Sequence, residues 1–239
     1  MARKPAERVP YSAIVDRPPL KLPDGGRIAV WTVVNVEEWS IERPMPRTVL
    51  PPPYGQPLLP DLPNWAWHEY GMRVGFWRLV EVLAKYRIKA IRELTGKAPR
   101  GWESPGLTET YETIDLLAEE GIEYVADWVM DDQPFVIATT SKPVVSIPYT
   151  VETNDIPIML LQHHSSDEWL RRGIDHFERL YAESEKITRV MAVSVHPYIT
   201  GVPHRIGYLE KLYEHILSRP GVMMWTGEQV LDWYLSAGK

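Results

Sequence analysis

Two largely apolar runs stand out along the chain, and polar or turn-forming residues bound each of them. Residues 27–35 read RIAVWTVVN, and residues 188–195 read TRVMAVSV. Runs of this length that are rich in β-branched residues and do not alternate are typical of strands covered on both faces, as in parallel sheets. Shorter apolar runs over 122–126, 144–147 and 222–225 predict three further strands.

Between these strands, apolar residues recur at every third or fourth position, which is the period of a helix. The segment 73–94 has this spacing and contains no proline, so we expect it to be helical throughout. Ser165-x-x-Glu168 and Thr226-x-x-Gln229 are typical capping boxes that open two later helices. The remaining helices are predicted over 110–120 and 206–217. Strands that alternate with helices predict an α/β fold with a parallel sheet, either open or rolled into a barrel.

Two segments lack periodicity and are rich in proline. Residues 1–26 predict an arm that lies on the surface of its own domain or of a neighbouring subunit. Residues 40–63 contain eight prolines, which leaves little helix or sheet available to the backbone. A long ordered loop of this kind is either a cover for a functional site or a passive surface loop. We therefore interpret 1–239 as one domain with an arm and a cover loop.

Composition narrows the classes of function. The chain has 239 residues, of which 44% are hydrophobic, so it can bury a core of ordinary size. Its net charge of -6 disfavours nucleic acid and anionic lipid surfaces as partners. The absence of cysteine excludes disulfides, thiolate metal sites and a cysteine nucleophile. The chain shows neither a secretory signal pattern nor an apolar stretch of about 18 residues, so we expect a cytoplasmic protein.

The ends of the two clearest strands carry the candidate chemistry. In parallel α/β folds, side chains just beyond the C-terminal ends of strands face the ligand. This rule selects Glu37 and Glu38 after the first run and His196 after the second. A carboxylate at such a position can deprotonate water or bind a cation, and a histidine can protonate a leaving nitrogen. The alternative is that the glutamates form a solvated turn and that the histidine is structural.

Several motifs around these residues occur in a specific order. Val34-Asn35-Val36-Glu37-Glu38 is followed by HEYGMRVGFWR over residues 68–78. The later motifs are Arg100-Gly101-Trp102, Asp127-Trp128 with DDQPF at 131–135, Pro148-Tyr149 with Asn154-Asp155, and Val195-His196 with Gly201 and Arg205. From about residue 23 onward, the chain thus resembles the polysaccharide-deacetylase superfamily, and more narrowly its allantoinase-like branch of cyclic ureide and imide hydrolases. The resemblance implies a parallel (β/α) barrel of the deacetylase type.

The resemblance also implies roles for individual residues. Glu37 would be the base that activates water, His196 the acid, and Glu38 a ligand of a zinc-like divalent metal. The residues that would shape the substrate pocket are Trp39, Glu69, Arg73, Trp102, Asp131, Asp132 and Asn154. Four of these residues also have a structural interpretation: Arg73 and Asp131 would only form an ion pair, Trp102 would belong to the core, and Asn154 would cap a turn.

One family element is missing. A second, histidine-containing metal motif has no match, and the chain is shortened near Ala90 and Ile91, where the family has several tens of additional residues. Three protein ligands are the usual minimum for a catalytic zinc-type site, and the adjacent His163 and His164 are poor replacements because their side chains diverge. His68, His176, His204 and His215 fall on predicted helices or loops, and only His204 is a candidate for ligand binding. Either the chain is continuous and helical through residue 90, or residues are missing at this point.

These observations favour a hydrolase of carbon–nitrogen bonds other than peptide bonds, acting on a small cyclic amide, ureide or N-acetyl substrate. An inactive relative that serves as a binding or assembly subunit is the alternative, and the missing motif supports it. A carbohydrate-binding module that uses exposed tryptophans is a third hypothesis. We expect a small-molecule substrate and a homo-oligomer, with no nucleic-acid or membrane partner.

Overall fold

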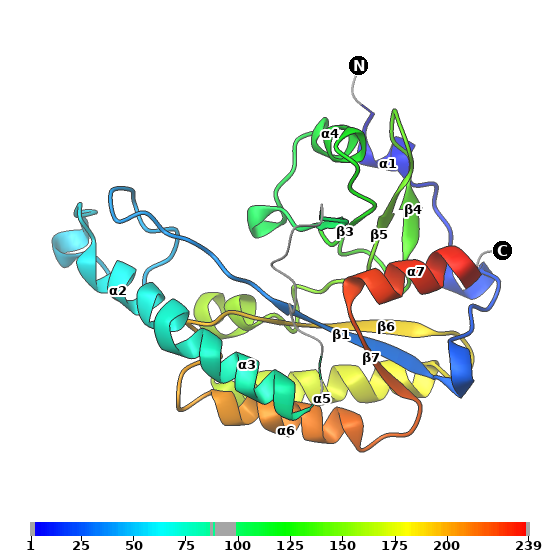
Figure 1. Ribbon diagram of the computed structural model, residues 1–239. Coiled ribbons are helices and arrows are strands. Elements are labelled where there is room, and N and C mark those ends of the chain that lie inside the picture. The colour runs from blue at the N-terminus through cyan, green and yellow to red at the C-terminus, as the bar shows by residue number, and fades with distance from the viewer. Residues whose placement is uncertain (1–2, 87, 89–98, 238–239) are drawn as a thin grey trace.

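The computed structural model describes residues 3–86, 88 and 99–237 (Figure 1). The helices are α1 (Pro5–Arg8), α2 (Leu62–Tyr70), α3 (Phe76–Lys85), α4 (Thr113–Glu119), α5 (Ser166–Glu183), α6 (Ile206–Leu217) and α7 (Gly227–Ala237). The strands are β1 (Ile28–Val34), β2 (Gly101–Trp102), β3 (Tyr124–Val125), β4 (Phe135–Ile137), β5 (Val144–Ser146), β6 (Arg189–Val195) and β7 (Val222–Trp225). Of two π-helical turns, η4 (Gly71–Gly75) joins α2 to α3, and η6 (Ile156–Leu161) lies between β5 and α5.

The central sheet is parallel and has the strand order β6-β1-β7. The pairing of β1 with β6 runs from Ile28 opposite Arg189 to Val34 opposite Val195, so the two strands end side by side. Every residue of β6 is buried, as are the first four residues of β1. The prediction of two central strands covered on both faces is therefore confirmed.

A second, small sheet consists of four strands of two or three residues each, in the order β2-β3-β5-β4, in which β4 is antiparallel to β5. We did not predict β2 or β4, because two or three residues are too few to show a period. Within the described residues, no strand pairing joins the two sheets, so the barrel is not closed. The chain thus has the expected α/β fold in the form of an incomplete barrel.

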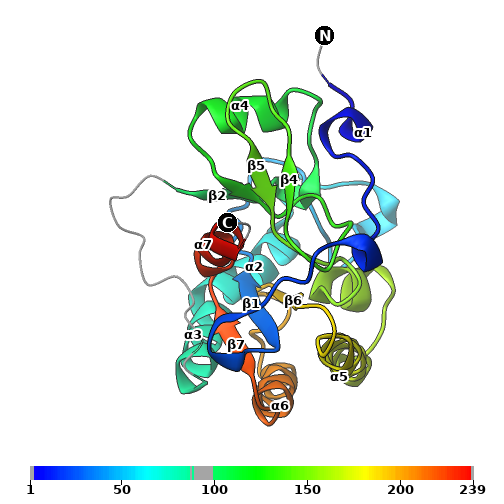
Figure 2. The same cartoon turned by 90° about the vertical axis from the view of Figure 1, so that its right-hand side faces the viewer.

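The central sheet separates two apolar layers. Figures 1 and 2 show α3, α5 and α6 on one side of it and the small sheet on the other. Ile28 and Val30 face the helices, whereas Ala29 and Trp31 face the interior between the sheets, where α7 also packs. This alternation follows from the two-residue period of a strand.

The prediction of one continuous helix over residues 73–94 is wrong after Lys85, where residues 86 and 88 are described and are not helical, while residues 87 and 89–94 lie outside the described residues. Helix α3 ends at Lys85, and the N–H of Ile88 donates to the carbonyl of Leu83 at 2.8 Å. This bond closes the last turn, and Ile88 and Leu83 are both buried in the core beneath it. The predicted break between Ala90 and Ile91 lies outside the described residues.

The predictions for the remaining elements are largely confirmed. Helix α6 and strand β7 have the predicted bounds, and Thr226 and Gln229 form the reciprocal capping bonds at 3.3 and 3.0 Å. Ser165 does not cap α5 with its side chain, contrary to the prediction. The arm packs on its own domain, where Arg8 is buried against α4. No helix in the described ranges combines the length and the apolar character that a membrane span requires.

Candidate active site

Glu37 and His196 meet at one edge of the central sheet. The pairing of β1 with β6 continues past both strands, because the N–H of Asn35 donates to the carbonyl of Val195 at 2.9 Å. The Oε1 atom of Glu37 lies 3.9 Å from Nε2 of His196. This separation exceeds a hydrogen bond but leaves both groups within reach of one water molecule or one substrate atom. The expected placement of these two residues on neighbouring strand ends is observed.

A buried aspartate holds the histidine from the other side. Asp155 is fully buried directly before η6, and its Oδ1 lies 2.7 Å from Nδ1 of His196. Its Oδ2 accepts from the backbone N–H of His196 at 2.8 Å and from the hydroxyl of Thr200 at 2.6 Å. An ionised carboxylate only accepts hydrogen bonds, so Nδ1 carries a hydrogen and Nε2 faces Glu37.

Three donors surround the carboxylate of Glu37. The hydroxyl of Tyr198 donates at 3.0 Å, the indole N–H of Trp39 at 3.1 Å, and the guanidinium of Arg47 at 3.3 Å to each oxygen. Burial together with the negative charge of Glu37 raises the pKa of Tyr198, which keeps its hydroxyl protonated. The carboxylate is therefore held as an acceptor in one orientation.

Aromatic rings form the wall behind Glu37. Trp39 is buried and stacks on the imidazole of His68 with 4.2 Å between ring centroids, and Tyr198 packs on its edge at 5.3 Å. His68 is also fully buried, and neither of its ring nitrogens has a hydrogen-bond partner among the described residues. Burial lowers the pKa of His68, so its ring is neutral at physiological pH.

Steric crowding explains why the HEYGMRVGFWR motif has glycine at positions 71 and 75. Gly71 lies against the backbone of Tyr198, and Gly75 lies against the carbonyl of Pro197. A Cβ atom at either glycine would collide with that loop. Only glycine permits such close backbone approach, so the motif brings η4 onto the segment that follows His196 and supports Tyr198.

Two predicted pocket residues come from the same motif: Glu69 lies on α2, and Arg73 lies on η4. Nε of Arg73 is 3.0 Å from Oε2 of Glu69, and the arginine side chain is 73% exposed. Within the described residues, neither side chain contacts Glu37 or His196. Arg73 thus pairs with Glu69 and not with Asp131, so the structural interpretation of Arg73 and Asp131 as an ion pair is wrong. The substrate-binding role of Glu69 and Arg73 stays a prediction.

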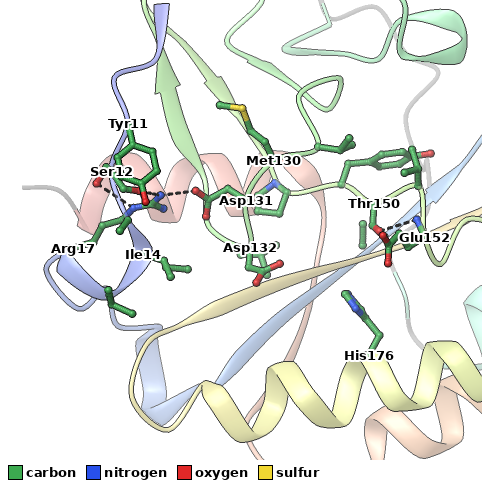
Figure 3. A pocket seen from close by; sticks show the side chains of 18 residues that line it. Tyr11, Ser12, Ile14, Arg17, Met130, Asp131, Asp132, Thr150, Glu152 and His176 are labelled. Atoms are coloured by element: carbon green, nitrogen blue, oxygen red, sulfur yellow. Dashed lines mark hydrogen bonds and ion pairs between the residues drawn. The ribbon is translucent and has the colours of Figure 1, made fainter. Parts of the chain in front are cut away.

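Asp131 and Asp132 line a separate cavity of about 700 Å³ between the arm, β6 and α5 (Figure 3). Asp131 pairs with Arg17 of the arm at 2.6 Å. Burial raises the pKa of Asp132 and lowers the pKa of His176, which lines the same cavity. Glu37 and His196 do not line this cavity, so the two aspartates are not gathered with them.

The remaining predicted residues have varied surroundings. Trp102 is 42% exposed and therefore does not belong to the core, and its indole donates to Ser104. Asn154 is buried and accepts from the N–H of Ile156 at 2.9 Å, so it caps the turn that begins η6.

Glu38, the predicted metal ligand, is exposed. No three histidine, aspartate or glutamate side chains of the described residues gather as metal ligands. These side chains therefore do not fit a divalent metal site around Glu38.

Sequence reasoning missed several residues of the site. Asp155 lies in a motif that we identified, but we selected its neighbour Asn154. Arg47 lies in the predicted cover loop, where nothing marks one arginine above another. Glu103 follows β2, and its burial beside Tyr149 raises its pKa to about 7, with His196 and Glu37 close enough to influence its charge. A carboxyl group that is half protonated near neutral pH is a candidate proton donor.

Comparison with known proteins assigns most of the chain to a family. The model for glycosyl hydrolase family 57 matches residues 48–232. The chain belongs to this family. Two curated relatives are a protein of Schizosaccharomyces pombe named as a polysaccharide deacetylase, 30% identical over 61% of the chain, and a peptidoglycan deacetylase of Helicobacter pylori, 26% identical over 65% of the chain. The chain spans 51% and 63% of their lengths.

Solved structures agree on the fold of this family member. A probable polysaccharide deacetylase from Pseudomonas aeruginosa PAO1 superposes with a TM-score of 0.81 at 21% identity, and Puue allantoinase with 0.82 at 22%. Each comparison covers 95% of this chain and 98% of the other. The predicted barrel fold of the deacetylase type is confirmed by these structures, and the predicted resemblance to the polysaccharide-deacetylase superfamily agrees with the names of the curated relatives.

Proposed function

We propose that this protein hydrolyses a carbon–nitrogen bond of a small amide: a cyclic amide, a ureide or an N-acetyl group. The observation that carries the proposal is the placement of Glu37 3.9 Å from Nε2 of a histidine whose Nδ1 is held by buried Asp155. A base and an acid on either side of one small gap are the groups that amide hydrolysis requires. The curated relatives, which are named as deacetylases, support an active enzyme over an inactive subunit.

The reaction follows from these positions. Glu37 removes a proton from water as the water oxygen attacks the carbonyl carbon, and the carbonyl electron pair moves onto oxygen to form a tetrahedral oxyanion. When the oxyanion collapses, the carbon–nitrogen bond breaks, and His196, protonated on both ring nitrogens at this stage, gives its Nε2 proton to the departing nitrogen. The proton that Glu37 took from water then passes to Nε2, 3.9 Å away, and restores both groups. The products are a carboxylic acid, which ionises, and an amine or amide nitrogen. Asp155 stabilises the positive charge of the imidazole for as long as Nε2 carries its proton.

A divalent metal has no step in this mechanism. Glu38 stands apart as an exposed side chain, and the described residues do not assemble three ligands around it. We therefore assign the chemistry of the site to Glu37, His196 and their protein neighbours.

The test is a substrate panel of hydantoin, succinimide, allantoin and chitin oligosaccharides, with release of carboxylate followed by NMR. We expect turnover of at least one amide substrate by the wild-type protein and its loss in Glu37→Gln and in His196→Asn. The control is Arg43→Ala, a change at an exposed position of the cover loop. Turnover that survives in both active-site variants would refute the assignment.

A second candidate is hydrolysis of a glycosidic bond, and Glu103 favours it. Glycosidases pair an ionised carboxylate with a carboxylic acid whose pKa is raised, and Glu103 has a pKa of about 7 beside the charge of Glu37. The matched family is also named for glycosyl hydrolases. Release of reducing sugar from an oligosaccharide, without release of acetate, would favour this reaction over amide hydrolysis.

We further propose a homo-oligomer in the cytoplasm. The cover loop and the start of α2 expose Leu50, Leu58, Leu59 and Leu62, each more than half exposed, and association would shield such residues from water. Light scattering of the purified chain would test this, and a monomer at micromolar concentration would contradict it.

A further inference from the structure

Arg47 is the cation at the candidate active site. Its NH1 group lies 3.3 Å from both oxygens of Glu37 and 3.4 Å from the hydroxyl of Tyr198. No other lysine or arginine in the described part of the chain contacts the Glu37 carboxylate. The bonds from Arg47 are longer than the usual 2.7–3.2 Å of N–H···O bonds, so they are loose enough to rearrange when a substrate enters.

Contacts of the residues before and after Arg47 fix the position of the cover loop. Just after Arg47, the buried Asn64 of α2 accepts from the N–H groups of Val49 and Leu50 at 2.8 and 3.0 Å and donates to the carbonyl of Leu50 at 2.9 Å. Just before it, Met45 packs against the main core. The loop therefore presents Arg47 in a defined place, as a preorganised donor requires.

Most of the donors of this guanidinium are unused. An arginine carries five N–H donors, and within the described residues only NH1 of Arg47 has a hydrogen-bond partner. The side chain is 26% exposed, so a small molecule can reach it. The proposed reaction develops negative charge on an oxygen beside Glu37, where this cation lies.

We propose that Arg47 is the oxyanion donor of the reaction. This inference rests on the proposed amide hydrolysis and assigns the group that binds the substrate carbonyl. The free N–H groups of Arg47 would donate to the carbonyl oxygen of the bound amide, and the bonds would strengthen as the carbonyl electron pair moves onto that oxygen. When the tetrahedral intermediate collapses, the pair returns to form the carboxylic acid, whose ionised form keeps Arg47 as its partner. Carboxylate products are therefore ligands of the same group.

Binding of acetate tests the inference without turnover. Glu37→Gln removes the competing negative charge while keeping the shape of the side chain, and tryptophan fluorescence reports the site because Trp39 adjoins residue 37. We expect Glu37→Gln to bind acetate and the double variant with Arg47→Ala to bind it at least about tenfold more weakly, because a charge-assisted bond is lost. The matched control, Glu37→Gln with Arg43→Ala, should bind as Glu37→Gln does.

Two results would overturn the inference. If Glu37→Gln fails to bind acetate, Arg47 offers no free anion site. If the double variant with Arg47→Ala binds equally well, Arg47 only positions Glu37. Circular dichroism verifies that each variant is folded.

Kinetics on an amide substrate from the panel adds a second measurement. We expect Arg47→Ala to lower kcat by about 10²–10³-fold, the usual cost of losing one oxyanion donor, and to change KM by only a few-fold. Added guanidinium should restore part of the rate, and a variant that loses only substrate affinity would count against an oxyanion role. If no amide in the panel is hydrolysed, the proposed function fails, while the acetate experiment still decides whether Arg47 is an anion donor.

Discussion

Replacing Asp155 with asparagine should move the ring hydrogen of His196 from Nδ1 to Nε2 without changing the shape of the site. The backbone N–H of His196 can only donate, so the amide oxygen of the asparagine must take the place of Oδ2, which accepts this bond at 2.8 Å. The amide NH₂ group then faces Nδ1, at the position where Oδ1 now lies 2.7 Å away. Nδ1 must become an acceptor, so the neutral ring carries its hydrogen on Nε2, and a doubly protonated ring would meet the NH₂ group with a clash of donors.

The magnitude follows from this count of bonds. The variant keeps three hydrogen bonds at this position, but none of them involves a charge any longer, which destabilises the fold. The removal of a fully buried charge offsets this loss. We therefore expect the free energy of unfolding to change by no more than about 2 kcal/mol. Catalysis loses the stabilised imidazolium, and kcat should fall by about 10²–10⁴-fold, or about 3–5 kcal/mol of activation free energy. A large kinetic loss with a small stability change is the expected signature.

The assay combines kcat on an amide substrate with the ¹⁵N shifts of the His196 ring, which report the tautomer whether or not a substrate is known. Thr200→Val is the matched control: it removes the 2.6 Å bond to Oδ2 but leaves Nδ1 facing a carboxylate. Its kcat should stay within about fivefold of the wild type, since only one neighbouring bond is lost. A folded Asp155→Asn protein with an unchanged tautomer and nearly unchanged kcat would refute the reasoning.

Three further predictions concern single residues. Glu37→Gln should abolish turnover and leave the thermal unfolding midpoint unchanged, because the two side chains are nearly isosteric; activity within a few-fold would assign the base elsewhere. Arg8→Ala removes two bonds to Asp115, at 2.8 and 2.6 Å, and should lower the free energy of unfolding in urea by about 2–4 kcal/mol at pH 7. The pair with Arg8 lowers the pKa of Asp115 to about 2, so this loss should be complete above about pH 4 and shrink as pH falls toward 2; a constant difference would contradict the coupling. Burial raises the pKa of Glu103 to about 7, so the contribution of this carboxyl to the free energy of unfolding should decline between about pH 4.5 and 7. Glu103→Gln should therefore gain stability relative to the wild type at about pH 8 but not at about pH 4, and equal effects at both pH values would show that the carboxyl is not buried.

Local pattern predicts an element well when the element is long and its burial is uniform. Strands β1 and β6 are seven residues each and pack apolar side chains on both faces, so each has a largely apolar sequence without polar alternation. The three residues of β4 form a strand because β5 offers an antiparallel partner, which no local period reveals. The end of α3 was mispredicted for a similar reason, because the apolar spacing continues through Ile88 while packing turns the chain at Lys85.

The sequence by itself determined the fold class and the meeting of Glu37 with His196, because parallel strands that pair in register end at one edge of a sheet. Tertiary structure decided what surrounds that pair. Asp155 reaches His196 from 41 positions earlier in the chain, and Arg47 reaches Glu37 from a loop that Asn64 holds in place. Periodicity reports which face of an element is buried, whereas the path of a loop depends on contacts distant in sequence, so only the folded chain shows which polar side chains converge.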